Sequence, residues 1–303
     1  MFEVTLVGTG GMMPLKDRHL SSMICRFKTK NILFDCGEGT QISLQKIGWG
    51  FKSIDVICIT HFHADHVSGL PGLLHAINHS GREEELIIAG PVGLKKIVES
   101  LLIIARGLSF PIKYLEIESE ENSITIGELT IKSLLLEHRV PCLAYKIETH
   151  RQGKFDIELA KALNIPKQFY SELQKGNEII HEEKRYTPNM VLGTPRKGFK
   201  IVFCTDTRPI EEIVQFAEYA DLFICEGIYA DDDKLEKAKE YKHMLFSEAA
   251  HLAKKANVKE LWLTHYSPSL SNPEDFIENA RDIFENSHTG FDGKSTVLKY
   301  EKT

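Results

Sequence analysis

The sequence lacks the features that mark secreted or membrane-spanning proteins. Its cysteines form no CxxC pair, and several lie inside apolar runs, which favours buried reduced thiols over a disulfide framework. No apolar run approaches the ~20 residues that cross a bilayer, and the start, MFEVT, has no basic region followed by an apolar one. We therefore expect a cytoplasmic protein with no membrane segment. The scattered cysteines are Cys25, Cys36, Cys58, Cys142, Cys204 and Cys225.

An excess of positive charge is also missing. The formal net charge is −6, which argues weakly against a nucleic-acid partner because phosphate binding depends on basic residues. Net charge does not exclude such a partner, since a basic patch or a bound metal ion changes the local potential.

Short apolar runs alternate with segments of helical spacing along the 303 residues. This alternation predicts an α/β or layered αββα protein. The helical segments cover about 67–79, 92–106, 210–219, 246–256 and 274–285. The predicted strands are Val4–Val7, Ile32–Phe34, Val56–Ile59, Leu86–Ala89, Thr130–Leu136, Ile201–Cys204, Leu222–Cys225, Leu261–Leu263 and Val297–Tyr300.

The region from about 153 to 185 departs from this pattern. It is rich in Lys and Glu, has two short helix-like pieces and contains no apolar strand of its own. We expect an insertion that projects from the core. A solvated helical excursion without a function is the alternative at this point.

The segment THFHADHVSG, residues 60–69, carries the strongest chemical signal. Imidazole and carboxylate groups are the usual ligands of a catalytic zinc. His61 and His63 are two positions apart, so in an extended segment they face the same way. Asp65 and His66 follow after a turn and are placed to serve a second ion nearby. The segment predicts a metal-dependent hydrolase.

Further ligands are expected at the ends of other buried strands. His138, Asp206 and His265 each follow a strand-like apolar run by one or two positions. Singly, each is more often an ordinary polar residue than a ligand. Their shared placement together with residues 61–66 favours a common site.

These motifs together resemble the metallo-β-lactamase fold hydrolases and, within them, the ribonuclease Z family of tRNA 3′-processing endonucleases. The HxHxDH element alone identifies only the superfamily. The narrower resemblance rests on LVGTGGMMPLKDRHLSSM at the N-terminus, ILFDCGEGTQ at 32–41 and GTPRKGFKIVFCTDTRP at 193–209. It extends from Glu3 to Tyr266.

The resemblance implies a fold and residue roles. The fold would be a four-layer αββα sandwich, a single catalytic domain over 1–303, with an inserted substrate-binding arm at about 153–185. Asp65 would also take part in proton transfer, as a carboxylate beside the metal. His243 would be the general acid for the leaving 3′-oxygen, although Met244 and Leu245 stand where the family often has small hydroxyl residues. One zinc ion would be bound by His61, His63 and His138, the other by Asp65, His66 and His265, with Asp206 bridging the two.

The implied activity is zinc-dependent removal of the 3′ trailer from precursor tRNA, leaving a 3′-hydroxyl tRNA and a 5′-phosphorylated trailer. The resemblance also implies a homodimer. A small-molecule phosphodiesterase of the same superfamily is one alternative, and a non-catalytic nucleic-acid-binding relative is another. In the arm, GKFD at 153–156 and NIP at 164–166 match the family, and four lysines would contact RNA phosphates: Lys154, Lys161, Lys167 and Lys175.

Overall fold

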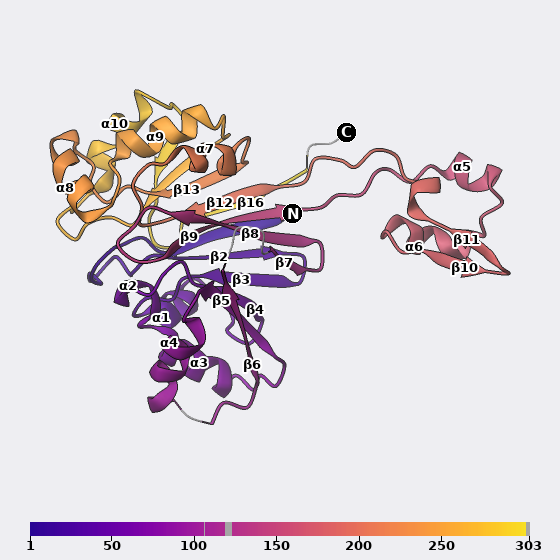
Figure 1. Ribbon diagram of the computed structural model, residues 1–303, viewed down its shortest axis with the longest axis horizontal. Coiled ribbons are helices and arrows are strands. Elements are labelled where there is room, and N and C mark those ends of the chain that lie inside the picture. The colour runs from indigo at the N-terminus through magenta and orange to yellow at the C-terminus, as the bar shows by residue number, and fades with distance from the viewer. Residues whose placement is uncertain (106, 119–122, 301–303) are drawn as a thin grey trace.

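The computed structural model describes residues 1–105, 107–118 and 123–300. Two large sheets lie face to face with helices on their outer sides, and a small arm projects far from this body (Figure 1). No helix in the described ranges is long and apolar enough to cross a membrane.

The first sheet has seven strands in the order β16-β1-β2-β3-β4-β5-β6. The strands from β3 to β6 run parallel, so their carboxyl ends meet at one edge. Short helices cover its outer face through an apolar layer that includes Leu33, Ile57 and Leu73. The strands are β1 (Phe2–Gly8), β2 (Ser22–Phe27), β3 (Lys30–Phe34), β4 (Ile54–Cys58), β5 (Leu86–Pro91), β6 (Ile112–Ile117) and β16 (Ser295–Leu298); the helices are α1 (Thr40–Lys46), α2 (Ala64–Val67), α3 (Leu70–His79), α4 (Leu94–Leu101) and η1 (Leu102–Ile104).

The second sheet also has seven strands, in the order β15-β14-β13-β12-β9-β8-β7. Its central strands β12, β13 and β14 are parallel and almost wholly buried. The strands are β7 (Ser123–Ile126), β8 (Leu129–Leu136), β9 (Cys142–Thr149), β12 (Lys200–Cys204), β13 (Leu222–Glu226), β14 (Leu261–Thr264) and β15 (Ser287–Thr289). The helices that accompany it are α7 (Glu211–Ala217), η4 (Asp232–Lys234), α8 (Leu235–Tyr241), α9 (Phe246–Lys255), η5 (Pro273–Phe276) and α10 (Glu278–Arg281).

The inner faces of both sheets form one apolar core. The ring of Phe34 from the first sheet lies 5.6 Å from that of Tyr145 and 5.8 Å from that of Phe203, both in the second sheet. All three side chains are buried, and such aromatic burial dominates core stability. Helices, two sheets and helices therefore form four layers, which confirms the predicted αββα sandwich.

The nine predicted strands all occur, but other strands were missed, among them β2, β6 and β9. The helix predicted over 67–79 begins only at Leu70, as α3, and Val67 is the last residue of the preceding short helix α2. The segment 274–285 contains only η5 and α10. The end of the predicted helix 92–106 includes residue 106, outside the described ranges; the structure has α4 and η1 before it.

The arm has its own small core. It contains α5 (Ile157–Ala162), η2 (Lys167–Phe169), α6 (Tyr170–Gln174), β10 (Ile179–His181), β11 (Lys184–Tyr186) and η3 (Pro188–Met190). No apolar strand was expected here, and the structure adds a short hairpin in which β10 pairs with β11 through Glu182 and Glu183, both in the left-handed region. Two long connecting segments join this unit to β9 and β12 (Figure 1).

Candidate metal centre

The candidate ligands lie at strand ends of both sheets. In the first sheet, His61 follows β4, and the short helix α2 then supplies Asp65 and His66. In the second sheet, His138, Asp206 and His265 follow β8, β12 and β14. The backbone is in the left-handed region at Asp206 (φ 38°) and His265 (φ 59°), an uncommon conformation for such residues and one that clusters at functional sites.

The structure brings all seven predicted ligands together, as two groups around one carboxylate. In each group the ligand atoms lie within 4.8 Å of one another. Asp206 Oδ2 faces one group, at 3.6 Å from His61 Nε2 and 3.8 Å from His138 Nε2. Its other oxygen, Oδ1, lies 3.4 Å from His66 Nε2 and 3.1 Å from His265 Nε2. The two groups are His61, His63, His138 and Asp206, and Asp65, His66 and His265.

This donor set fits divalent metal ions. Zinc is bound by imidazole nitrogens and carboxylate oxygens at about 2.0–2.2 Å, so donors that share an ion lie about 3–3.6 Å apart. His63 Nδ1 lies 3.0 Å from His61 Nε2 and 3.3 Å from His138 Nε2. Asp206 Oδ1 is buried without a hydrogen-bond partner among the described residues. An orphaned buried carboxylate oxygen is costly unless a cation satisfies it.

Asp35 fixes the histidines of both groups from behind. This fully buried carboxylate accepts hydrogen bonds from His66 Nδ1 at 2.7 Å, from the Thr60 backbone N–H at 2.7 Å and from Thr60 Oγ1 at 2.9 Å. Because the Thr60 hydroxyl donates to Asp35, its oxygen can accept from His61 Nδ1, 3.0 Å away. Both histidines therefore present Nε2 to the cluster, the arrangement that metal-binding histidines need.

The glycine-rich opening packs directly against the cluster. The Met12 backbone N–H donates to Asp65 Oδ2 at 2.7 Å. A side chain at Gly11 would place its Cβ 2.7 Å from Cε1 of His265, closer than real contacts allow. Glycine is required there for close approach of the backbone to the histidine.

His243 lies beside the cluster and is oriented by a buried glutamate. Its ring centroid is 5.3 Å from that of His138 and 5.7 Å from that of His265. His243 Nδ1 lies 3.2 Å from Oε2 of the fully buried Glu226, which also accepts from the Met244 backbone N–H. Burial disfavours the charged imidazole, but the charge and hydrogen bond of Glu226 outweigh it and raise the pKa of His243 to about 9.

The other histidines differ in protonation. Burial lowers the pKa of His61 well below its usual value, and that of His63 and His138 to a lesser degree, so these histidines are neutral and able to bind a cation. Burial disfavours ionised Asp206, but the charges of the surrounding histidines outweigh it and hold its pKa well below the usual range. Burial disfavours a charged His66, but the charges of Asp206 and Asp35 outweigh it and raise the pKa of His66 well above its usual value. The centre therefore combines the neutral His61, His63 and His138 with a charged His66 around an ionised carboxylate.

Comparison with known proteins identifies the family. The chain is 48% identical to ribonuclease Z of Clostridium acetobutylicum over 99% of both chains, and 49% identical to that of Agathobacter rectalis over the full length of both. The chain belongs to the ribonuclease Z family. This confirms the predicted membership and, with it, hydrolytic endoribonuclease activity; it favours neither the small-molecule phosphodiesterase nor the non-catalytic relative.

Solved structures agree with the family and the fold. The human short form of tRNase Z has a TM-score of 0.71 at 26% identity, covering 98% of this chain and 100% of its own. The metallo-β-lactamase fold protein YhfI from Bacillus subtilis has a TM-score of 0.70 at 20% identity, covering 97% and 98%, a likeness that concerns the fold alone. A family model described as "Anti-Pycsar protein Apyc1" matches residues 2–103, about a third of this ribonuclease Z family member.

Sequence reasoning missed the residues that support the centre. Asp35 follows β3 directly, and Glu226 is the last residue of β13. Like His138, Asp206 and His265, both lie at the end of a buried strand, so the same placement could have identified them. Arg208, which contacts Glu248 and the carbonyl of His243, carries no such signal.

The four arm lysines are exposed and lie far along the chain from the centre, within the arm. Two of them are already paired: Lys161 with Glu158 at 2.8 Å and Lys175 with Glu172 at 2.6 Å. Lys154 and Lys167 form no ion pair among the described residues.

Proposed function

We propose that this ribonuclease Z family member removes the 3′ trailer from precursor tRNA by hydrolysing one phosphodiester bond, using two zinc ions per subunit. The observation that carries the proposal is Asp206, whose two oxygens face two separate groups of ligand atoms. Two-metal sites of this kind serve in-line displacement at phosphorus. The human relative named tRNase Z supports tRNA as the substrate.

The ligand roles follow from the two groups. We assign one ion to His61, His63 and His138, the other to Asp65, His66 and His265, with Asp206 shared. When bound, the ions supply Lewis-acid activation of the attacking water and of the phosphodiester oxygens.

The chain's own groups move the protons. Asp65, oriented by the Met12 backbone N–H, accepts a proton from the attacking water. His243, held protonated by Glu226, donates a proton to the 3′-oxygen as the bond from phosphorus to that oxygen breaks. The water oxygen stays on phosphorus, so the products are a 3′-hydroxyl tRNA and a 5′-phosphorylated trailer.

The proposal treats residues 1–303 as one catalytic domain with a substrate-binding arm at 153–185, acting as a homodimer in the cytoplasm. The six buried, unpaired cysteines support a reducing compartment. Light scattering of the purified protein tests the dimer, and cell fractionation tests the location.

The decisive experiment is cleavage of a precursor tRNA with and without an encoded CCA, with products mapped at nucleotide resolution. We expect one cut at the start of the trailer and loss of both cleavage and bound zinc in Asp206→Ala. Full activity of that variant would contradict the proposed centre. Deleting 153–185 should raise KM for precursor tRNA and spare a chromogenic phosphodiester.

A further inference from the structure

The arm carries no net positive charge with which to hold RNA. Residues 153–185 contain six basic and six acidic residues. Half of the basic side chains are neutralised by glutamates of the arm itself. These pairs are Lys161–Glu158, Lys175–Glu172 and Arg185–Glu178, at 2.8, 2.6 and 2.5 Å. RNA phosphates therefore need positive charge from elsewhere along the projection.

At the root of the arm, where the two connecting segments come together at residues 151 and 196, two arginines lie directly opposite each other. Arg151 and Arg196 pair across the two connecting segments, and the Arg196 backbone N–H donates to the Arg151 carbonyl at 3.0 Å. Like charges directly opposite each other are destabilising. The ion pairs found among the described residues give neither arginine a carboxylate partner. Arg196 Nε instead donates to the Gln152 carbonyl at 3.0 Å.

Aromatic side chains hold the Arg151 guanidinium in place. It lies 4.2 Å from the centroid of Tyr300, and Tyr300 stacks on Phe199 with centroids 4.3 Å apart and planes 10° apart. Phe199 is buried. A fixed guanidinium loses less entropy when it binds an anion, and its planar fork matches phosphate geometry.

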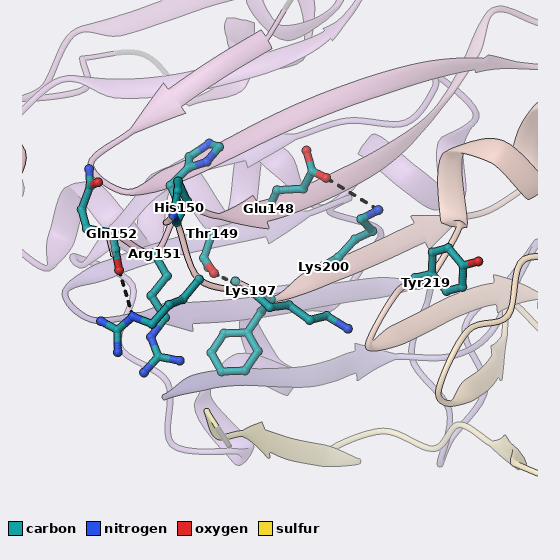
Figure 2. Close-up of a pocket in the computed structure, with 12 residues that line it drawn as sticks. Glu148, Thr149, His150, Arg151, Gln152, Lys197, Lys200 and Tyr219 are labelled. Atoms are coloured by element: carbon teal, nitrogen blue, oxygen red, sulfur yellow. Dashed lines mark hydrogen bonds and ion pairs between the residues drawn. The ribbon is translucent and has the colours of Figure 1, made fainter. Parts of the chain in front are cut away.

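The two arginines border two adjoining hollows. One, of about 360 Å³, is also lined by Lys197, Lys299 and Tyr300. The other, of about 580 Å³, includes Lys200, and Figure 2 shows Glu148 turned toward that lysine and away from Arg151. The other acidic groups that line the hollows are also engaged elsewhere: Asp221 lies 2.9 Å from Lys259 and 4.0 Å from Lys197, and Glu260 accepts a hydrogen bond from Trp262 Nε1.

The geometry points to the arm's root as a second RNA-binding site, in which Arg151 and Arg196 contact backbone phosphates of the same precursor tRNA. This inference rests on the proposed function and moves the main phosphate contact from the arm's lysines to its root. Strand β12 begins four residues after Arg196 and ends two residues before Asp206, so ten residues, or at most roughly 33 Å of extended chain, separate the root from the centre. One RNA molecule is long enough to contact both.

The test compares wild type with Arg151→Gln/Arg196→Gln, using fluorescence anisotropy of a labelled precursor tRNA at several salt concentrations. Each lost phosphate contact should lower the steepness of the plot of log binding constant against log salt concentration by about 1. The slope of the double variant should therefore be smaller by about 1–2, and its affinity should be roughly ten-fold or more weaker. Lys113→Gln is the matched control, an exposed lysine on the edge strand β6 of the other sheet. It should bind as wild type does.

Arg151→Lys/Arg196→Lys keeps the charge and should retain most of the salt dependence. Arg196→Gln alone leaves the Arg151–Tyr300 contact intact and still tests one contact if the double variant melts early. Unchanged affinity and slope, or weaker binding with an unchanged slope, would overturn the inference. The binding measurement does not depend on cleavage. If wild type binds this RNA but does not cut it, the proposed function is contradicted, and the comparison of affinities still decides whether the root contacts RNA.

Discussion

Asp35→Asn should weaken metal binding although Asp35 is not among the predicted ligands. The side chain keeps its size, and its oxygen can still accept from the Thr60 backbone N–H. Its amide NH₂, however, faces groups that donate to the carboxylate, His66 Nδ1 at 2.7 Å and Thr60 Oγ1 at 2.9 Å. His66 must then accept at Nδ1 and carry its proton on Nε2, the atom that faces Asp206 Oδ1 at 3.4 Å.

The expected loss of metal affinity follows from the lost contacts. Removing the partner behind a metal-binding histidine typically costs 10–100-fold in metal affinity, or about 1.4–2.7 kcal/mol. We expect the loss to fall on the ion assigned to Asp65, His66 and His265. Competition with a chelator, followed by metal analysis, measures it as one ion released at lower chelator concentration.

Asp292→Asn is the matched control. Asp292 also accepts from a threonine hydroxyl, a backbone N–H and a histidine Nδ1, through Thr9 and His19. The Asp292→Asn substitution should lower the unfolding temperature without changing metal affinity. Equal metal affinities of Asp35→Asn and wild type would refute the argument from the tautomer of His66.

Three further variants test the remaining parts of the centre. His243→Ala should keep both ions while kcat falls by the ~10²–10⁴ typical of a lost acid–base group; loss of metal would instead make His243 a ligand. Glu226→Gln removes the charge that raises the pKa of His243, so the fall in kcat at high pH, where a general acid is deprotonated, should move to lower pH; an unmoved profile contradicts this role. Gly11→Ala should lower metal content and activity, because its Cβ would lie 2.7 Å from His265; normal zinc occupancy would show that the loop yields instead.

The candidate ligands could be picked out from the sequence because strand ends can be recognised from apolar runs. The carboxyl ends of the central strands meet at one edge, so His61, Asp206 and His265 converge although they are far apart in the chain. The fold class was predictable from the same runs. Strand β9 was missed although it begins with the apolar run at 142–145, because Lys146 and Glu148 interrupt its second half.

Other features depend on side-chain geometry that no pattern encodes. The hairpin of the arm has strands of three residues, too short for any periodicity. The opposition of Arg151 and Arg196 depends on how two segments 45 residues apart come together. The pairing of Lys161 with Glu158 and of Lys175 with Glu172, by contrast, follows a spacing of three residues and was readable from the sequence.

The candidate ligands come from both halves of the chain, and metal binding there would affect folding as well as catalysis. His61, Asp65 and His66 belong to the first sheet, whereas His138, Asp206 and His265 belong to the second. Bound ions would therefore cross-link two sheets that meet through apolar contacts and through a few hydrogen bonds, such as that from the Tyr145 hydroxyl to the Ile59 carbonyl. An ion present at 1,000 times its dissociation constant stabilises the folded state by about 4 kcal/mol. The metal supply of the cell would then set how long the folded enzyme persists, in addition to how fast it works.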